Sequence, residues 1–232
     1  MNTLAGPLAR SLVKLAGTPD DSSDVDDRLV ELAQLAAETL PAVDYASTTA
    51  LRADAYTTVA ASSALASAVD EAQYADGGGP CLEALQSGVP VTVTDVTTTM
   101  KWPGFRRTAG RLGLHSSVSV PLFAGRGDAV ASMNLYGRDA VAMADLAKHV
   151  RGAFDPVPAQ PSGSPVMTGA DDLAAGLVQA LAVRDRIQLA IGILVERDRC
   201  SATEAYLSLR VCAAEAGVPL PDMATRTLRE LD

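Results

Sequence analysis

The sequence has few of the side chains on which metal centres, disulfide frameworks and acid–base active sites depend. Only three of its 232 residues are cysteine and two are histidine. Cys81, Cys200 and Cys212 lack the short paired spacing of metal ligands and leave one thiol over, which argues against a disulfide framework. We therefore expect no metal site and a reducing, cytoplasmic location.

The sequence also lacks a long apolar run. No stretch approaches the length of a membrane span, so we expect no membrane partner. The N-terminal segment is interrupted by Arg10 and Lys14 and has no continuous signal-peptide core. Its leucines recur every three or four residues, at Leu4, Leu8, Leu12 and Leu15. This spacing predicts a short amphipathic helix that docks on a domain or on a partner subunit.

Basic and aromatic residues are scarce as well. The chain has 19 Lys and Arg against 28 Asp and Glu, a formal net charge of −9. This balance excludes a generally basic protein that coats nucleic acid, because such binding depends on Lys and Arg meeting phosphates. Any nucleic-acid contact must be local. Aromatic residues make up 4% of the chain, and core packing is the expected role for most of them.

Hydrophobic residues, by contrast, make up 48% of the chain, which is enough for packed cores. The length suits two small domains. We predict an N-terminal helix and tail at 1–24, a first domain at 25–153, an extended proline-rich linker at 154–167 and a helical domain at 168–232.

The first domain contains both segments with the apolar spacing of helices and segments with the alternation of strands. Helices are expected at 25–40, 62–75, 81–86, 105–112 and 141–154. Strands are expected within 44–61 around a turn, and at 89–95, 115–123 and 129–136, the last two as a hairpin. The prediction is an α+β fold with an antiparallel sheet flanked by helices.

Three features of this domain invite a chemical interpretation. The segment 76–80, Asp-Gly-Gly-Gly-Pro, lacks the preceding strand and the Lys of a phosphate-binding loop, so a turn is favoured. Cys81 at a helix entry is either a redox thiol with a lowered pKa or a small half-buried residue. His115 adjoins Ser116 and Ser117, but neighbours on a strand point to opposite faces and cannot form a triad. We predict no catalytic residues.

A ligand pocket in the first domain would be lined by polar and aromatic side chains, with simple core packing as the alternative. The candidates are Cys81, Trp102, Phe105, Ser117, Ser119 and Tyr136. No cofactor is expected.

Several segments of this domain carry a family resemblance. The segments at 79–84, 91–95, 102–103, 117–122 and 134–136 together resemble a GAF domain, of the subclass that precedes ANTAR domains in actinobacterial proteins. The resemblance implies a sensor or dimerisation domain. It names no ligand, because GAF domains bind unrelated molecules.

The pattern of residues 168–232 predicts three helices. Apolar residues recur at helical spacing through Leu173, Leu177, Leu181, Ile187, Ile191 and Leu194. Ser201 and Glu204 then form a capping-box start for a second helix that ends near Gly217. Pro219 and Pro221 open the third.

This segment resembles the ANTAR output domain, the RNA-binding module of bacterial antitermination regulators. The residues that match are Arg184, Ile187, Ala190, Gly192, Ile193, Leu194, Glu204, Ala205, Tyr206, Leu209, Arg210, Asp222, Met223 and Ala224. The chain departs at Ile191, where many members carry Lys, and at Gly217, where many carry Asn. The resemblance implies recognition of RNA hairpin loops, whose bases are unstacked and readable.

The predicted RNA contacts come from all three helices. They are Arg186, Arg197, Arg199, Tyr206, Arg210, Arg226 and Arg229. Arg186 and Arg197 are eleven residues apart and emerge within ~20° of each other. Arg210 is the strongest single candidate because it matches the family's Leu-Arg pair, whereas Tyr206 is equally well explained as a core aromatic. Arg184 falls on the packing stripe and is expected to pair with an acidic neighbour.

The prediction is an antitermination regulator that binds tandem RNA stem-loops in nascent transcripts as a homodimer, with an unidentified small-molecule ligand possible for the GAF-like domain. Seven arginines against ten acidic residues in 168–232 favour an alternative, a protein-interaction module without nucleic acid. DNA binding by a helix-turn-helix is a third possibility.

Overall fold

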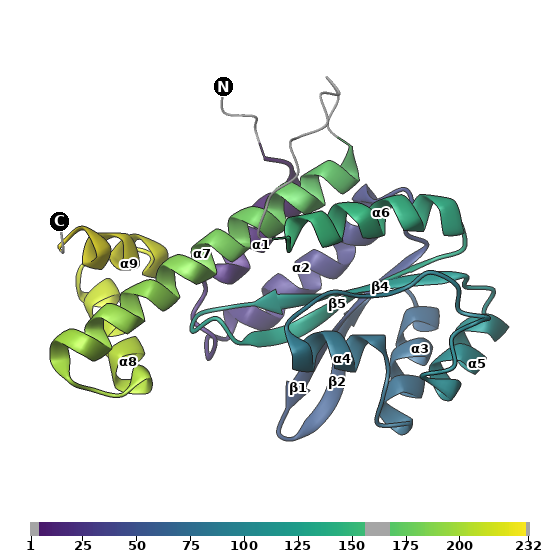
Figure 1. Cartoon of the computed structure of the whole chain (residues 1–232), viewed down its shortest axis with the longest axis horizontal. Coiled ribbons are helices and arrows are strands. Elements are labelled where there is room, and N and C mark those ends of the chain that lie inside the picture. The colour runs from purple at the N-terminus through teal and green to yellow at the C-terminus, as the bar shows by residue number, and fades with distance from the viewer. Residues whose placement is uncertain (1–4, 156–167, 231–232) are drawn as a thin grey trace.

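A five-stranded antiparallel sheet organises the first two thirds of the chain (Figure 1). The structure, a computed structural model, describes residues 5–155 and 168–230. The strands are β1 (Tyr45–Arg52), β2 (Ala55–Ala61), β3 (Val91–Val93), β4 (Ser116–Phe123) and β5 (Ala129–Gly137), in the order β2-β1-β5-β4-β3. The strand predicted at 89–95 is thus shorter than expected, and the others lie where their alternation placed them.

The two faces of the sheet differ in chemistry because successive strand residues point to opposite sides. One face is apolar, through Ala46, Ala50, Val118, Val120, Leu122, Ala131, Met133 and Leu135. The other face is polar, through Ser47, Thr49, Ser117, Ser119, Ser132, Asn134 and Tyr136. Both sets are buried, so helices cover both sides.

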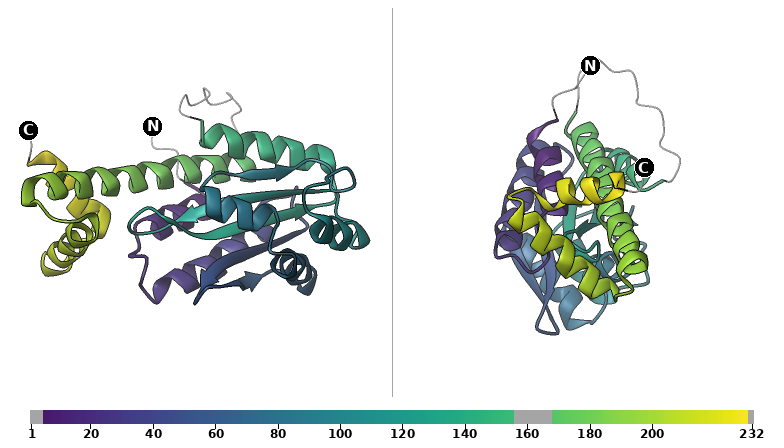
Figure 2. Two further views of the ribbon diagram at one scale, coloured as in Figure 1. Left: turned by 60° about the horizontal axis from the view of Figure 1, so that its bottom comes forward. Right: turned by 90° about the vertical axis from the view of Figure 1, so that its left-hand side faces the viewer.

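Helices form a layer on each face (Figure 2). The apolar face packs against α1 (Pro7–Ala16), α2 (Asp24–Thr39), α6 (Ala140–Ala153) and the first half of α7 (Gly169–Asp198). The polar face is covered by α3 (Ala64–Ala75) and α4 (Pro80–Ser87), with α5 (Pro103–Arg111) beside α3. This arrangement confirms the predicted α+β class.

The C-terminal helices are α7, α8 (Ala202–Glu215) and α9 (Leu220–Arg229), and we call them the output helices. The predicted capping box is present, since Ser201 Oγ accepts from Glu204 N at 3.3 Å and Glu204 Oε2 accepts from Ser201 N at 2.8 Å. Gly217 follows α8 with a φ of 62°, the left-handed conformation that glycine adopts without strain. The 30 residues of α7 span about 45 Å, so its far end carries α8 and α9 beyond the sheet (Figure 2).

The N-terminal helix α1 docks on α7. Gly176 of α7 allows this close approach, because a Cβ at that position would lie 2.5 Å from the Ala9 Cα. Asp172 of α7 also accepts hydrogen bonds from Gly6 N at 2.6 Å and Ala9 N at 3.3 Å. A carboxylate from one helix therefore caps the positive N-terminus of another.

One apolar core joins the predicted domains. It is continuous from Leu8 in α1 to Ala224 in α9. The predicted linker falls largely on residues 156–167, outside the described residues, but the helices on either side of it, α6 and α7, pack against each other. The reason is that the first half of α7 carries its own apolar stripe, including Leu173 and Leu177, which is buried beside α1 and α6.

The contact between α1 and α7 generates a prediction with a control in the same helix. We expect Gly176→Ala to destabilise the chain by about 1–3 kcal/mol, because the new methyl group meets the Ala9 backbone. Gly192→Ala should be neutral or stabilising by up to about 1 kcal/mol, because a Cβ there meets nothing within 4 Å and alanine is the better helix former. Urea unfolding of both variants measures the difference, and equal stabilities would contradict the packing.

Candidate functional site

Asp70 of α3 is the centre of a buried polar layer on the polar face of the sheet. Its carboxylate accepts hydrogen bonds from Tyr136 Oη at 2.5 Å, Thr58 Oγ1 at 3.0 Å and Asn134 Nδ2 at 3.3 Å. Complete burial raises the pKa of Asp70 to about 6, although these hydrogen bonds oppose the rise. A carboxyl group that titrates near neutral pH is therefore held between the sheet and α3.

Gln73 links this layer to α4. Its amide nitrogen donates to Tyr136 Oη at 3.2 Å, and its amide oxygen accepts from Cys81 N at 3.0 Å. Gly79 permits the contact, because a Cβ there would collide with the Gln73 side chain. The segment 76–80 is thus a turn that seats α4, and Asp76 Oδ2 also accepts from Gly104 N at 2.7 Å at the start of α5.

The structure brings most of the predicted ligand-binding residues to this layer. Five of them, Cys81, Phe105, Ser117, Ser119 and Tyr136, are fully buried, and Trp102 is partly exposed. The ring of Trp102 meets Phe105 edge-on at a centroid distance of 6.4 Å. Within the described residues, the hydroxyl groups of Ser117 and Ser119 have no hydrogen-bond partner. These two orphaned hydroxyls mark the place where the layer is incomplete.

The position of Cys81 in the structure fits neither of the two interpretations based on sequence. Its side chain is fully buried rather than half-buried. Burial raises the pKa of the Cys81 thiol, and the charge of Asp70 raises it further. A reactive thiol needs a lowered pKa and access to solvent, so the redox interpretation of Cys81 is wrong for this conformation.

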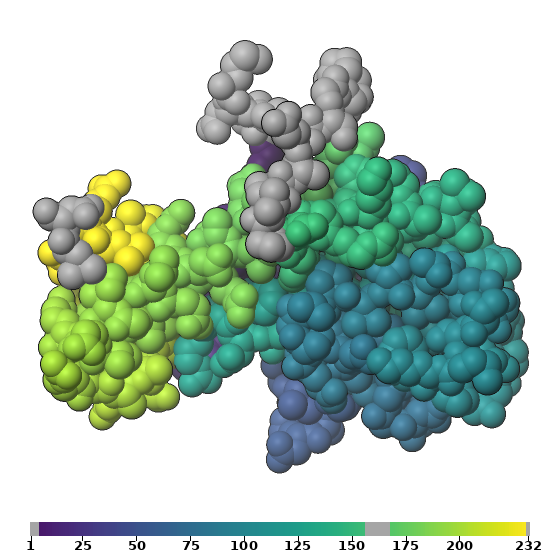
Figure 3. Space-filling view, in the orientation of Figure 1, coloured from purple at the N-terminus to yellow at the C-terminus, as the bar shows by residue number. Residues whose placement is uncertain are grey.

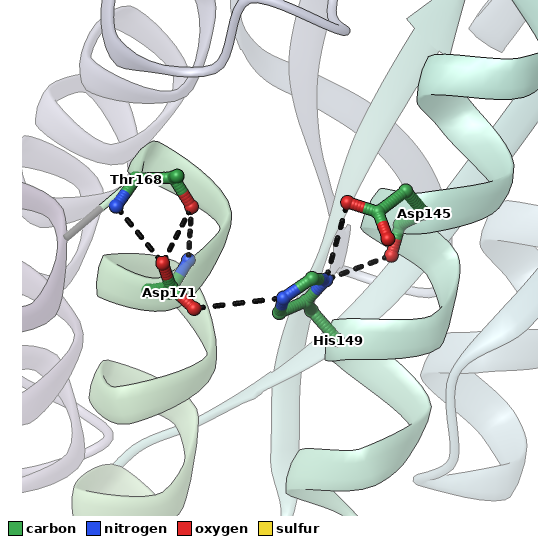
Figure 4. A network of polar contacts seen from close by, with 4 residues as sticks. All are labelled: Asp145, His149, Thr168 and Asp171. Carbon is green, nitrogen blue, oxygen red and sulfur yellow. Dashed lines mark hydrogen bonds and ion pairs between the residues drawn. The ribbon is translucent and has the colours of Figure 1, made fainter. Parts of the chain in front are cut away.

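His149 joins α6 to the first turn of α7 (Figure 4). Its Nε2 lies 3.5 Å from Asp171 Oδ1, and its Nδ1 lies 2.9 Å from the carbonyl oxygen of Asp145. Asp171 closes a capping box with Thr168, whose amide and hydroxyl groups lower the pKa of Asp171. The start of the output helices is therefore fixed by side chains on both sides of residues 156–167.

Arg184 fastens α7 to the turn between β4 and β5. Its Nε donates to the carbonyl oxygen of Gly127 at 2.7 Å, and its guanidinium group lies 4.3 Å from the Phe123 ring centroid. The expected acidic partner is thus replaced by a carbonyl group and an aromatic face. These partners could not be predicted from the sequence, because residues 123 and 127 are distant from residue 184 in the chain.

Tyr206 and Arg210 of α8 face the GAF-like domain rather than solvent. The Tyr206 hydroxyl donates to Asp20 Oδ1 at 2.8 Å, and Arg210 Nη1 donates to Asp21 Oδ2 at 2.8 Å. Only 3% of Tyr206 is exposed, and this burial together with Asp20 raises its pKa. The paired Arg210 lowers the pKa of Asp21. Asp20 and Asp21 fall in the segment predicted as the N-terminal helix and tail, 1–24, for which no contact with α8 was predicted.

Four of the other predicted RNA contacts lie at the far end of the output helices, and Arg186 lies about 16 Å before Arg197 along α7. Arg197 lies 3.5 Å from Glu230, and Arg226 lies one turn before Glu230, so both flank the ends of α7 and α9. Arg229 is exposed beside them, and Arg186 shares the azimuth of Arg197. Arg199 ends α7 with a φ of 54° and pairs with Glu196 at 3.4 Å. The predicted contacts thus divide between this end and the α8 face.

Residues 5–155 and 168–230 lack a membrane-spanning helix and a cluster of metal ligands. No helix in this part of the chain has both the length and the apolar character to cross a membrane. The same residues contain no group of three or more His, Cys, Asp and Glu side chains that could hold a metal ion.

Comparisons with known families define the class of protein. The GAF domain model matches residues 22–149, and the ANTAR domain model matches residues 175–227. The first of these covers more than half of the chain. The chain therefore belongs to the GAF and ANTAR domain-containing proteins.

Solved structures and curated proteins add little beyond this. A domain of a sensor histidine kinase protein from Sinorhizobium meliloti 1021 is 14% identical, with a TM-score of 0.42 over 72% of this chain and 93% of that chain. The A. aeolicus nlh2 GAF domain in an inactive state is 11% identical, with a TM-score of 0.44 over 76% and 94%. Type II free methionine-R-sulfoxide reductase from Thermoplasma acidophilum is 16% identical, with a TM-score of 0.36 over 59% and 88%. No curated protein matches.

The raised pKa of Asp70 predicts a pH dependence that Asp70→Asn removes. The folded chain holds the Asp70 proton up to a pH of about 6, whereas the unfolded chain releases it near 3.8. The stabilising contribution is therefore present below the lower value and is lost as the pH rises to about 6. This difference corresponds to roughly 3 kcal/mol.

Urea unfolding of the wild type and of Asp70→Asn between pH 4 and pH 7 tests the assignment. The wild type should lose stability relative to the variant as the pH rises. Parallel profiles for the two proteins would show that Asp70 is ionised throughout.

Proposed function

We propose that this chain is a transcription antitermination regulator whose output helices bind RNA stem-loops. The observation that carries the proposal is the ANTAR match at 175–227 together with the basic end formed by Arg197, Arg226 and Arg229. Antitermination follows if binding of a nascent transcript prevents its terminator hairpin from forming. The proposed location is the cytoplasm, where nascent transcripts are made.

The acidic charge of the chain restricts where RNA binds. Because phosphate binding depends on local Lys and Arg, a chain with a net charge of −9 must use a concentrated patch. At the ends of α7 and α9, Arg197 is paired with Asp198 and Glu230, whereas Arg226 and Arg229 have no ion pair within the described residues. We therefore place the main phosphate contacts on Arg226 and Arg229, with Arg186 on the Arg197 side of α7. Arg199 is exposed at the adjacent corner. Tyr206 and Arg210 would contribute once freed from their present contacts.

We also propose that the buried polar layer of the GAF-like domain is the site of a small hydrogen-bonding ligand. The support is chemical, since Ser117 and Ser119 present unpaired hydroxyls toward α4 and Asp70 titrates near neutral pH. Cys81 and Tyr136 would line the same space. Trp102 and Phe105 would border it from the α5 side. Because these residues are fully buried apart from Trp102, a ligand can reach them only when the helices that cover the layer open.

A protein-interaction module that binds no nucleic acid is the second candidate. The observation that favours it is that Tyr206 and Arg210 already contact protein carboxylates. Leu207 and Val211 of α8 are exposed large apolar residues, of the kind that protein partners cover. Retention of a protein partner by a chain that binds no RNA at low salt would establish this candidate.

We propose that two copies of the chain associate through α7. Val178, Ala182 and Leu189 are exposed along one side of this helix at steps of four and seven residues, which is the spacing of a helix-pairing stripe. Leu189 is 61% exposed. Two linked RNA-binding units would bind tandem stem-loops more tightly than one, because the second contact is intramolecular.

Light scattering measures this association directly. The expected mass is twice the 23.9 kDa of one chain, and Leu189→Lys should shift it toward one chain. A single-chain mass for the wild type, both with and without RNA, would contradict the dimer.

RNA binding is tested by removing two arginines at the basic end. We expect Arg226→Ala with Arg229→Ala to weaken binding to a pool of tandem stem-loops with randomised loops, and to reduce the slope of log affinity against log salt by about two. Arg106→Ala with Arg107→Ala on α5 is the matched control, since it removes the same charge at the far end of the molecule. Equal loss in both variants would indicate unspecific attraction, and no binding at low salt would refute the proposed function.

A further inference from the structure

The loop between α1 and α2 contacts the groups of α8 that RNA would need. Asp20 accepts from the Tyr206 hydroxyl, and Asp21 accepts from the Arg210 guanidinium group, both at 2.8 Å. We propose that Asp20 and Asp21 are an intramolecular competitor of RNA that keeps the α8 face closed. This inference rests on the proposed RNA-binding function and concerns the regulation of that site.

The chemistry of this contact is that of a protein–phosphate contact. Phosphate oxygens accept hydrogen bonds from arginine and tyrosine side chains, and these two carboxylates accept from the same donors. Two guanidinium groups also lie over the Tyr206 ring, since Arg126 and Arg210 are 6.0 and 5.5 Å from its centroid, within cation–π range. An RNA base cannot stack on this ring until these contacts open.

The contact between Asp20 and Tyr206 depends on the turn between β4 and β5. This turn lies against both α8 and the loop between α1 and α2, which we call the acidic loop (Figure 1). Gly125 in this turn has a φ of 52°. A Cβ at Gly125 would collide with the Tyr206 hydroxyl and would lie 2.6 Å from Asp20 N. Arg126 in the same turn pairs with Asp20 at 3.3 Å. Two separate segments, the α1–α2 loop and the β4–β5 turn, therefore close on Tyr206.

The same turn is the end of the two strands that carry the polar layer. Ser119 of β4 pairs with Asn134 of β5 over α3, and both strands continue to the turn at 124–128. The turn is held to α7 as well, because Arg184 Nε donates to Gly127 O at 2.7 Å. A change in the packing of the polar layer can thus reach the α8 face through continuous strands rather than through residues 156–167.

The contact is suited to reversible opening. The Asp21 side chain is 63% exposed, so solvent and salt reach its ion pair with Arg210. In the space-filling view the far end of α7, together with α8 and α9, projects as a lobe from the rest of the molecule (Figure 3). We call the contact of this lobe with the α1–α2 loop and the β4–β5 turn the seam. Competing phosphates can therefore reach the Asp21–Arg210 pair directly, whereas Tyr206 is buried in the apolar core and is freed only when α8 separates from the loop between α1 and α2.

The test compares two double variants that remove the same charge. Asp20→Asn with Asp21→Asn frees Tyr206 and Arg210 and keeps the side-chain shapes. Glu38→Gln with Asp54→Asn is the control, since both residues are exposed and, within the described residues, neither forms a hydrogen bond or an ion pair through its side chain. If nine tenths of wild-type molecules are closed, the first variant should bind the tandem stem-loop pool about ten-fold more tightly than the control does.

A second variant is designed to open the contact between Asp20 and Tyr206 without changing any charge. Gly125→Ala should also raise the affinity for the RNA pool, because its methyl group pushes Tyr206 away from Asp20. Hydrogen exchange of α8 amides without RNA should be faster in this variant and in Asp20→Asn with Asp21→Asn than in the control.

Three results would overturn the proposal, and they are distinguishable. Wild type and variants that bind RNA equally would refute the competition and leave the RNA-binding function standing. Faster α8 exchange without any gain in affinity would show that the contact is structural only. If no variant binds the pool at low salt, the proposed function fails and the competition fails with it.

Discussion

The burial of α7 along its first half is the constraint on which the rest of the structure depends. Gly176 lets α1 reach the backbone of α7, and Asp172 caps the N-terminus of α1, so the two helices stabilise each other. The same half of α7 packs beside α6 and is fixed by His149 at its start. A helix that belongs to the output domain by family thereby completes the core of the GAF-like domain, and the far end of that helix sets the position of α8 and α9.

Because of this packing, the two sets of predicted RNA contacts differ in how accessible they are. The arginines at the ends of α7 and α9 project from the molecule, where RNA can reach them without rearrangement. Tyr206 and Arg210 lie in the seam, where the chain's own carboxylates satisfy them. The seam also borders the β4–β5 turn, whose strands line the polar layer around Asp70. The polar layer and the α8 face are therefore connected through continuous strands, although residues 156–167 separate the two domains in sequence.

Much of the fold could be predicted from local pattern, because periodicity and capping are local signals. Ser201 and Glu204 predicted their helix start three residues apart, and the alternation of β4 and β5 predicted a hairpin. The contacts of Tyr206, Arg184 and Asp172 could not be predicted, since each partner is distant in the chain and an acidic loop has no sequence feature that names its partner. The complete burial of Cys81 could not be predicted either, because it depends on how α4 packs over the sheet.

The most direct test of a core shared by the two domains is native-state hydrogen exchange in low urea. Amides of α7 between Leu177 and Ile187 should exchange through the same opening as amides of β4 and β5, with the same free energy and the same dependence on urea. This result is predicted because these residues lie in one apolar cluster. An opening of much lower free energy that exposes α7, α8 and α9 while β4 and β5 stay protected would contradict the account.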